Sequence, residues 1–152
     1  MPDRATKSEK MEMTEKRPKV GLAIIILKEN KVLLGKRKNA HDAGAWAFPG
    51  GHLEWYESFS DCANREVKEE IGLEIELIDK NPIAITNDFF LADEKHYITL
   101  FLRARIKDNQ APKLMEPDWC EEWNWFEWEK LPDNLMIPIK NLIKQEYNPF
   151  KT

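Results

Sequence analysis

The feature that most constrains the fold is an aliphatic run from Val20 to Leu27, broken by one glycine and free of charged residues. Such a run predicts a β-strand that is buried on both faces. It is too short to cross a bilayer, which takes about 20 apolar residues. The residues before it interleave acidic and basic side chains without an apolar stretch, so they do not resemble a signal peptide. We therefore expect a cytoplasmic protein.

Several strands and two helices are expected along the rest of the chain. The segment 96–106 alternates apolar and polar residues and predicts a half-buried strand. Glu29-Asn30 predicts a tight turn. Further strands are expected at 32–37, 46–48, 73–78, 83–90 and 123–128, and helices at 58–71 and 134–147, the second interrupted by Pro138. Residues 1–18 are expected to be a flexible charged tail, and 19–152 a single mixed α/β domain.

Charge and cysteine content narrow the possible partners. The chain carries 23 basic and 27 acidic residues, for a net charge of −4 and a pI near 5.5. That balance argues against an electrostatic grip on a nucleic-acid polymer or an anionic membrane. It is compatible with a nucleotide-sized ligand held through a metal ion. Two cysteines, Cys62 and Cys120, are too few for a disulfide framework and are expected to be reduced.

Carboxylates are concentrated on the predicted helix 58–71. Glu66, Glu69 and Glu70 stand at positions i, i+3 and i+4 and therefore share one helix face. Arg65 is the nearby cation, and Glu57 adds a further negative charge just before the helix. A divalent cation, Mg²⁺ with Mn²⁺ as a substitute, suits such hard oxygen donors. A run of charges more often forms a solvated helix face, so this cluster alone leaves both interpretations open.

The spacing of these residues carries a family resemblance. Gly51, Glu57, Arg65-Glu66-Val67, Glu69-Glu70 and Gly72-Leu73 agree with every specified position of the Nudix box, Gly-x5-Glu-x7-Arg-Glu-U-x-Glu-Glu-x-Gly-U, where U is a bulky aliphatic residue. The chain thus resembles the Nudix hydrolases. The resemblance implies an α/β/α sandwich with a mixed sheet, in which the box forms a catalytic loop–helix–loop.

The resemblance also implies a metal site. Carried over position by position, Glu66 and Glu70 are the principal metal ligands, together with the backbone carbonyl of Gly50. Glu69 is either a ligand through water or the general base. In several Nudix enzymes a distal carboxylate also reaches the metal, and here Glu121 is preferred to its neighbour for that role.

Two further residues of the box are expected to support the site. In this family the glutamate at Glu57 commonly forms a salt bridge with the box arginine, Arg65, and so holds the loop. Gly51 serves a backbone geometry that a side chain would obstruct.

Motifs outside the box resemble one branch, the MutT-like nucleoside triphosphate diphosphatases, which includes vertebrate enzymes acting on thiopurine nucleotides and a plant relative acting on geranyl diphosphate. The motifs are Leu33–Arg37, Phe48–Glu54, Glu116-Pro117, Trp123-x-Trp125 and Asn148-Pro149-Phe150. This likeness implies hydrolysis of nucleoside triphosphates, modified or non-standard ones included, to the monophosphate and pyrophosphate. The implied role is cleansing of the nucleotide pool.

Substrate contacts are expected along the same motifs. Arg37 with Lys36 would bind the outer phosphates. The candidate residues for the rest of the substrate are Phe48, Gly51, His52, Tyr97, Thr99, Ile137 and Pro138. Ala47 and Pro138 depart from the vertebrate enzymes and are closer to the plant one, so a prenyl diphosphate, a nucleoside diphosphate and a nucleotide sugar stay open as alternatives. A Nudix binding module without catalysis is the remaining one.

The resemblance to this branch also implies a homodimer, because its members are typically homodimers. An aromatic cluster of Trp119, Trp123 and Trp125 offers apolar area for burial between subunits. The alternative is that these tryptophans fill the core.

Overall fold

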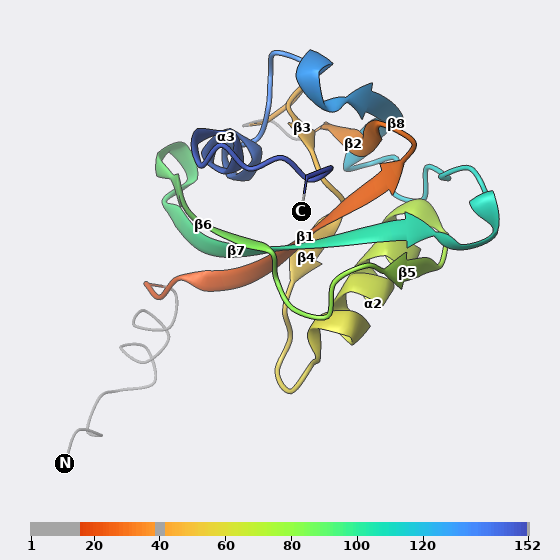
Figure 1. The fold of residues 1–152 in the computed structure, drawn as a ribbon. Coiled ribbons are helices and arrows are strands. Elements are labelled where there is room, and N and C mark those ends of the chain that lie inside the picture. The colour runs from red at the N-terminus through yellow and green to blue at the C-terminus, as the bar shows by residue number, and fades with distance from the viewer. Residues whose placement is uncertain (1–15, 39–41, 152) are drawn as a thin grey trace.

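A computed structural model describes residues 16–38 and 42–151, so most of the expected tail lies outside the described residues. Two helices cover opposite sides of a mixed sheet (Figure 1). The elements are β1 (Lys19–Lys28), β2 (Lys31–Arg37), β3 (Trp46–Ala47), β4 (Gly50–His52), α2 (Phe59–Ile71), β5 (Ile75–Leu77), β6 (Ala84–Phe90), β7 (Lys95–Ile106), β8 (Cys120–Glu127) and α3 (Ile137–Lys144). Short 3₁₀ turns follow β6, β7 and β8. The predicted α/β/α sandwich is confirmed.

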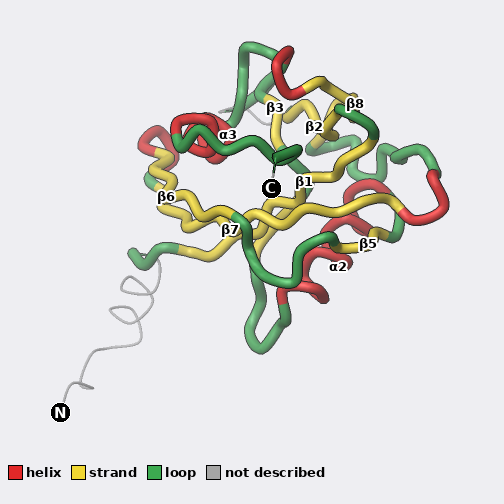
Figure 2. The backbone as a smooth tube through the Cα atoms, in the orientation of Figure 1, coloured by secondary structure: helices red, strands yellow, loops and turns green. Residues whose placement is uncertain are grey.

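Strand β1 is the centre of the sheet (Figure 2). It runs parallel to β7 from Lys19 to Ile26 and pairs antiparallel with β2 and β4. The strands β5 and β6 both pair antiparallel with β7, and β8 pairs with β2. The aliphatic run is buried from Leu22 to Leu27, as the sequence predicts. This strand therefore carries side chains into both layers of the core.

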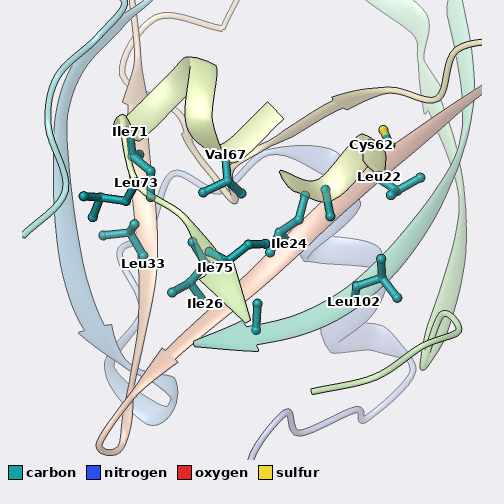
Figure 3. Packing of buried hydrophobic residues seen from close by; sticks show 12 residues of the cluster. Leu22, Ile24, Ile26, Leu33, Cys62, Val67, Ile71, Leu73, Ile75 and Leu102 are labelled. Carbon is teal, nitrogen blue, oxygen red and sulfur yellow. The ribbon is translucent and has the colours of Figure 1, made fainter. Parts of the chain in front are cut away.

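Helix α2 covers one face of the sheet. Its buried stripe, Ala63, Val67 and Ile71, packs against Ile24 and Leu102 from β1 and β7 (Figure 3). The predicted spacing of these residues is thus confirmed, and the opposite face of the helix is left for polar side chains.

The ends of α2 are fixed by local hydrogen bonds. The Ser58 side chain accepts a hydrogen bond from the backbone nitrogen of Asp61 at 3.0 Å, which caps the N-terminus. Gly72 ends the helix in the left-handed conformation, with φ of 69°. Both signals are readable in the sequence.

Helix α3 covers the other face, where Ile139 and Leu142 pack in a second cluster with Phe48 and Phe101. The expected helix 134–147 is shorter than predicted and Pro138 does not interrupt it. Pro138 lies in the first turn, where a backbone N–H has no partner within the helix in any case. Among residues 16–38 and 42–151 no helix has the length and apolar character of a membrane span.

Among the described strands, β4 is the one that the sequence did not indicate, because Pro49-Gly50-Gly51 reads as a turn. Gly50 pairs with Ala23 and Gly51 with Leu22 on β1. A Cβ atom on Gly50 would overlap the carbonyl oxygen of Leu22. The two backbones approach so closely that only glycine fits, and this is why a glycine pair forms a strand here.

Candidate active site

The site is built where β4 passes the polar face of α2. The backbone nitrogen of Gly50 donates a hydrogen bond to Oε2 of Glu70 at 3.0 Å. A Cβ atom on Gly51 would overlap the carboxylate of Glu66. The glycine strand therefore lets two carboxylates of one helix lie directly against its backbone.

The carboxylates of Glu66 and Glu70 have too little positive charge around them to keep their pKa values at the ordinary level. The pKa of Glu70 is raised to about 8, chiefly by burial and also by the neighbouring carboxylates of Glu66 and Glu116, against the hydrogen bond from Gly50. Burial is also the main cause that raises the pKa of Glu66, with contributions from Glu69 and Glu116. Buried anions that repel one another in this way favour a bound cation.

Arg65 connects these groups to the loop before the helix. Its Nε lies 2.7 Å from Oε2 of Glu57, and its Nη1 lies 2.7 Å from Oε1 of Glu66. The Nη2 atom also donates to the backbone carbonyl of His52 at 3.1 Å. The hydrogen bond from Arg65 lowers the pKa of Glu57 to about 2. The structure thus brings Glu57 and Arg65 together as a support for the loop.

Glu69 differs from Glu66 and Glu70, the two carboxylates of α2 that lie against β4. Its side chain is 53% exposed, and Oε2 lies 3.7 Å from Nη1 of Arg65. It shares the edge of the site with Glu66 but remains open to water. That exposure suits a group that exchanges protons with solvent.

The donor set fits a hard divalent cation. Glu66 and Glu70 carry carboxylate oxygens whose pKa values are raised in part by the charge of Glu116, and such oxygens are the donors that Mg²⁺ and Mn²⁺ prefer. Within the described part of the chain, no three acidic, histidine or cysteine residues form a ready-made chelating group. Glu66 and Glu70 instead accept hydrogen bonds from Arg65 and Gly50. A cation would compete with these donors for the carboxylate oxygens.

A cavity of about 290 Å³ lies beside this centre. Gly50 and Gly51 line it, together with Phe48 and, across the fold, Pro138 and Ile139 of α3. A second cavity of about 200 Å³ shares Asp42, Phe90, Asp93 and Met136 with the first, so the two are neighbours. Through Gly50 and Gly51 the carboxylates lie next to a cavity whose volume suits a small ligand.

Basic, acidic and hydroxyl-bearing residues provide the polar part of the first cavity. The Nε atom of Arg37, buried and without a hydrogen-bond partner among the described residues, lies 3.7 Å from Oδ2 of Asp42. At the other side Nε2 of His52 lies 2.9 Å from the hydroxyl of Tyr97. Burial, followed by the charges of Lys19 and Lys95, lowers the pKa of His52. Arg37 is thus placed to meet an anionic group of a ligand.

Not all of the expected site residues meet. Lys36 lies over the ring of Trp46 and 3.9 Å from Glu121, away from Arg37's cavity. Ile137 lines the second cavity, whereas Pro138 lines the first.

Among the described carboxylates outside α2, Glu116 is the one whose charge raises the pKa values of both Glu66 and Glu70. The sequence did not indicate Glu116 as a site residue, although Glu116-Pro117 is among the matched motifs. The predicted distal carboxylate was Glu121, with Glu122 as the alternative.

The tryptophans divide between two environments. Trp123 and Trp125 pack against the core cluster on the α2 side, whereas Trp119 is 56% exposed. A Cβ atom on Gly35 would meet the ring of Trp123 at 2.7 Å, which shows how closely that ring covers β2.

Comparison with known proteins decides the family. The family model described as "NUDIX domain" matches residues 16–145. The chain belongs to the Nudix family. Among curated relatives of this Nudix protein, an ADP-ribose pyrophosphatase of Methanocaldococcus jannaschii is 48% identical over 127 residues, 84% of this chain and 72% of the relative. An oxidized purine nucleoside triphosphate hydrolase of Danio rerio is 28% identical, over 74% of this chain and 69% of the relative.

Solved structures agree with this assignment. A MutT NUDIX hydrolase from Burkholderia pseudomallei superposes with a TM-score of 0.74 at 29% identity, covering 87% of this chain and all of that one. The protein is therefore a MutT-like Nudix hydrolase that acts on pyrophosphate bonds.

Proposed function

We propose that this Nudix hydrolase cleaves nucleoside triphosphates, modified or non-standard ones included, to the monophosphate and pyrophosphate, and so cleanses the nucleotide pool. The observation that carries the proposal is that Glu70 and Glu66 of α2 lie against Gly50 and Gly51, two residues that line a cavity of about 290 Å³. Likeness to a purine nucleoside triphosphate hydrolase supports the same substrate class.

The proposal assigns Mg²⁺, or Mn²⁺ in its place, to the carboxylates. Glu66, Glu70 and the Gly50 carbonyl would hold it, with Glu116 as the distal carboxylate. Mg²⁺ bound there would neutralise the charge of the phosphates and activate a water for attack at phosphorus. Glu69 would accept the proton of the attacking water, since it lies at the edge of the site and is open to solvent.

The other residues bind and orient. The Arg37 guanidinium, whose Nε is unpartnered, would hold a phosphate of the chain. Phe48, His52 and Tyr97 line the cavity that would receive the base. Arg65 and Glu57 keep the loop and Glu66 in place through their shared hydrogen bonds.

A nucleoside diphosphate joined to a sugar is the second candidate substrate. The neighbouring second cavity would give room for a group beyond the phosphates, and the relative from M. jannaschii is named an ADP-ribose pyrophosphatase. A prenyl diphosphate is less favoured because the cavity wall includes the hydroxyls of Tyr97 and Thr99. The retained carboxylates favour an enzyme over a binding module.

The test is a phosphate-release screen with coupled pyrophosphatase and Mg²⁺. It should cover the common and oxidised nucleoside triphosphates, ADP-ribose, geranyl diphosphate and a 5′-triphosphorylated RNA. We expect several nucleoside triphosphates to be hydrolysed with kcat/KM values within about two decades of one another. If ADP-ribose or geranyl diphosphate is at least about a hundredfold better than every triphosphate, the proposal fails.

Assembly and location stay predictions. We propose a homodimer in which the exposed Trp119 contributes to the contact, and a cytoplasmic location. Light scattering at micromolar concentration should then give about twice 17.9 kDa.

A further inference from the structure

One cluster holds all of the polar or charged side chains that are buried in the core among the residues that the structure describes. The residues are Thr86, Asp88 and Thr99, with 1%, 0% and 6% of their surface exposed. Thr86 and Asp88 lie on β6, and Thr99 lies opposite Thr86 on β7. Thr99 also lines the main cavity, so the cluster lies directly behind the proposed substrate site.

Asp88 is the centre of the cluster. Its Oδ2 atom accepts hydrogen bonds from the hydroxyls of Thr86 and Thr99, at 2.9 and 2.5 Å. Its Oδ1 atom accepts one from the Asn141 side chain on α3 at 2.8 Å. Helix α3 also supplies Pro138 to the cavity, so Asp88 joins two sides of the cavity, β7 and α3.

Joining strand β6 to helix α3 through the buried Asp88 carboxylate costs free energy of solvation. A buried carboxylate loses its hydration, and here its three hydrogen-bond donors are all uncharged. Well-packed apolar side chains of similar size often replace buried charges without loss of stability. The cluster therefore calls for an explanation other than packing, and the neighbouring cavity supplies one.

The chemistry of the two groups fixes which of them donates in the hydrogen bond between Thr99 and Asp88. A threonine hydroxyl carries one proton and two lone pairs, whereas a carboxylate can only accept hydrogen bonds. The Thr99 proton is therefore committed to Asp88, and the Thr99 oxygen has only lone pairs left for a ligand. The wall of the cavity has a fixed acceptor at this point.

We propose that Asp88 is a positioning residue that sets the hydrogen-bond polarity of the cavity. Thr99, held by Asp88 as an acceptor, binds an N–H donor on the base of the substrate. The inference rests on the proposed nucleotide function and makes it more specific, because it selects bases with an amino or imino group at that edge. A prenyl chain has no such donor and would leave the Thr99 oxygen unpaired.

A matched pair of variants separates this role from a structural one. Thr99→Val and Thr86→Val each remove one hydroxyl that donates to the same Asp88 oxygen, but only Thr99 lines the cavity. We expect Thr99→Val to raise KM for the best nucleotide about tenfold or more, with kcat within about twofold. Thr86→Val should lower the melting temperature comparably and leave KM within about twofold. Equal changes in KM would overturn the proposal.

Asp88→Asn tests the polarity itself. The Asn141 amide also lies 3.3 Å from the Asn87 carbonyl, which keeps its NH₂ group directed toward residue 88. The carboxamide oxygen of the variant would then face Asn141, and its NH₂ would donate to the threonines. Thr99 would be free to donate into the cavity, so the order of kcat/KM over ATP, GTP, CTP and UTP should change. A uniform fall for all four would overturn the proposal.

Binding measurements keep this inference separate from the proposed function. Should Asp88→Asn fail to fold, the two valine variants decide. Should the wild-type chain hydrolyse no nucleotide, the proposed function fails, and calorimetry with AMP, GMP, CMP and UMP still tests Thr99. The Thr99→Val variant should weaken the best of these about tenfold and leave ribose 5-phosphate, which has no base, unchanged. Equal weakening of both, or no binding of any monophosphate, overturns the inference.

Discussion

Arg65 and Glu57 form a two-pronged ion pair, with Nε 2.7 Å from Oε2 and Nη2 2.9 Å from Oε1. The pair joins α2 to the loop that follows β4. Because Nη1 of the same guanidinium also contacts Glu66, the pair fixes the loop and one candidate metal ligand together. Glu57 therefore acts through Arg65 and does not need to touch the substrate.

This geometry predicts unequal effects of three neutral substitutions. Glu66→Gln and Glu70→Gln should each lower kcat about a hundredfold or more, because each removes charge from the centre that stabilises the transition state. Glu57→Gln should lower it about tenfold, since Arg65 keeps its contact with Glu66. Steady-state kinetics at saturating Mg²⁺ measures all three. An equal loss in Glu57→Gln would show that its assigned role is wrong.

Glu116 and Glu121 offer a comparison of two candidate distal carboxylates. Glu116 raises the pKa values of Glu66 and Glu70, whereas Glu121 pairs with Lys36 and is 52% exposed. We expect Glu116→Gln to raise the Mg²⁺ concentration needed for half-maximal rate about tenfold. Glu121→Gln should leave it within about twofold. If Glu121→Gln raised the Mg²⁺ requirement and Glu116→Gln did not, Glu121 would be the distal carboxylate.

Gly21 allows the cavity to be filled without straining the strand. A Cβ atom there would meet no atom closer than 3.7 Å, and valine suits a β-strand. Gly21→Val should raise KM about tenfold or more while the melting temperature stays within a few degrees. Gly50→Ala is the contrasting control, because its Cβ would overlap the Leu22 carbonyl and should destabilise the fold. An unchanged KM in Gly21→Val would show that substrate does not occupy this cavity.

The pair of Asp79 and Arg103 predicts how stability depends on pH. Hydrogen bonds from Arg103 lower the pKa of Asp79 below its usual 3.8. A group whose pKa is lower in the folded state stabilises the fold above its unfolded pKa, and this contribution disappears as the pH falls through the folded value. Asp79→Asn should therefore be less stable than wild type by about 1–3 kcal/mol at pH 7. In urea titrations that difference should shrink below pH 3.8; a constant difference would contradict the assignment.

The sequence predicted those parts of the fold that depend on local patterns. The Val20–Leu27 run, the α2 stripe and the caps at Ser58 and Gly72 all act through neighbouring residues, so their spacing is sufficient. Strand β4 escaped prediction because its pairing depends on how closely Gly50 approaches β1, a contact between distant segments. The start of α3 was also not predicted by local pattern, since the helix begins at Ile137 and not at residue 134.

The candidate site shows the same division. The proximity of Glu66, Glu70 and Arg65 follows from their spacing on one helix, and the structure brings these residues together, whereas their expected roles came from the resemblance to the Nudix box. Glu116 could not be chosen from sequence, since its approach to α2 depends on the path of the chain before β8. Asp88 carried no signal at all, because its importance depends on Thr99 and Asn141 from two other elements.

The central claim is that the α2 carboxylates drive hydrolysis of the phosphate chain. Its most direct test is pyrophosphate release from nucleoside triphosphates with Mg²⁺, measured for wild type and for a Glu66→Gln/Glu70→Gln double variant of matched melting temperature. Wild type should release pyrophosphate and the monophosphate in equal amounts, and the double variant should be slower by about a hundredfold or more. Turnover in the double variant close to that of wild type would contradict the claim.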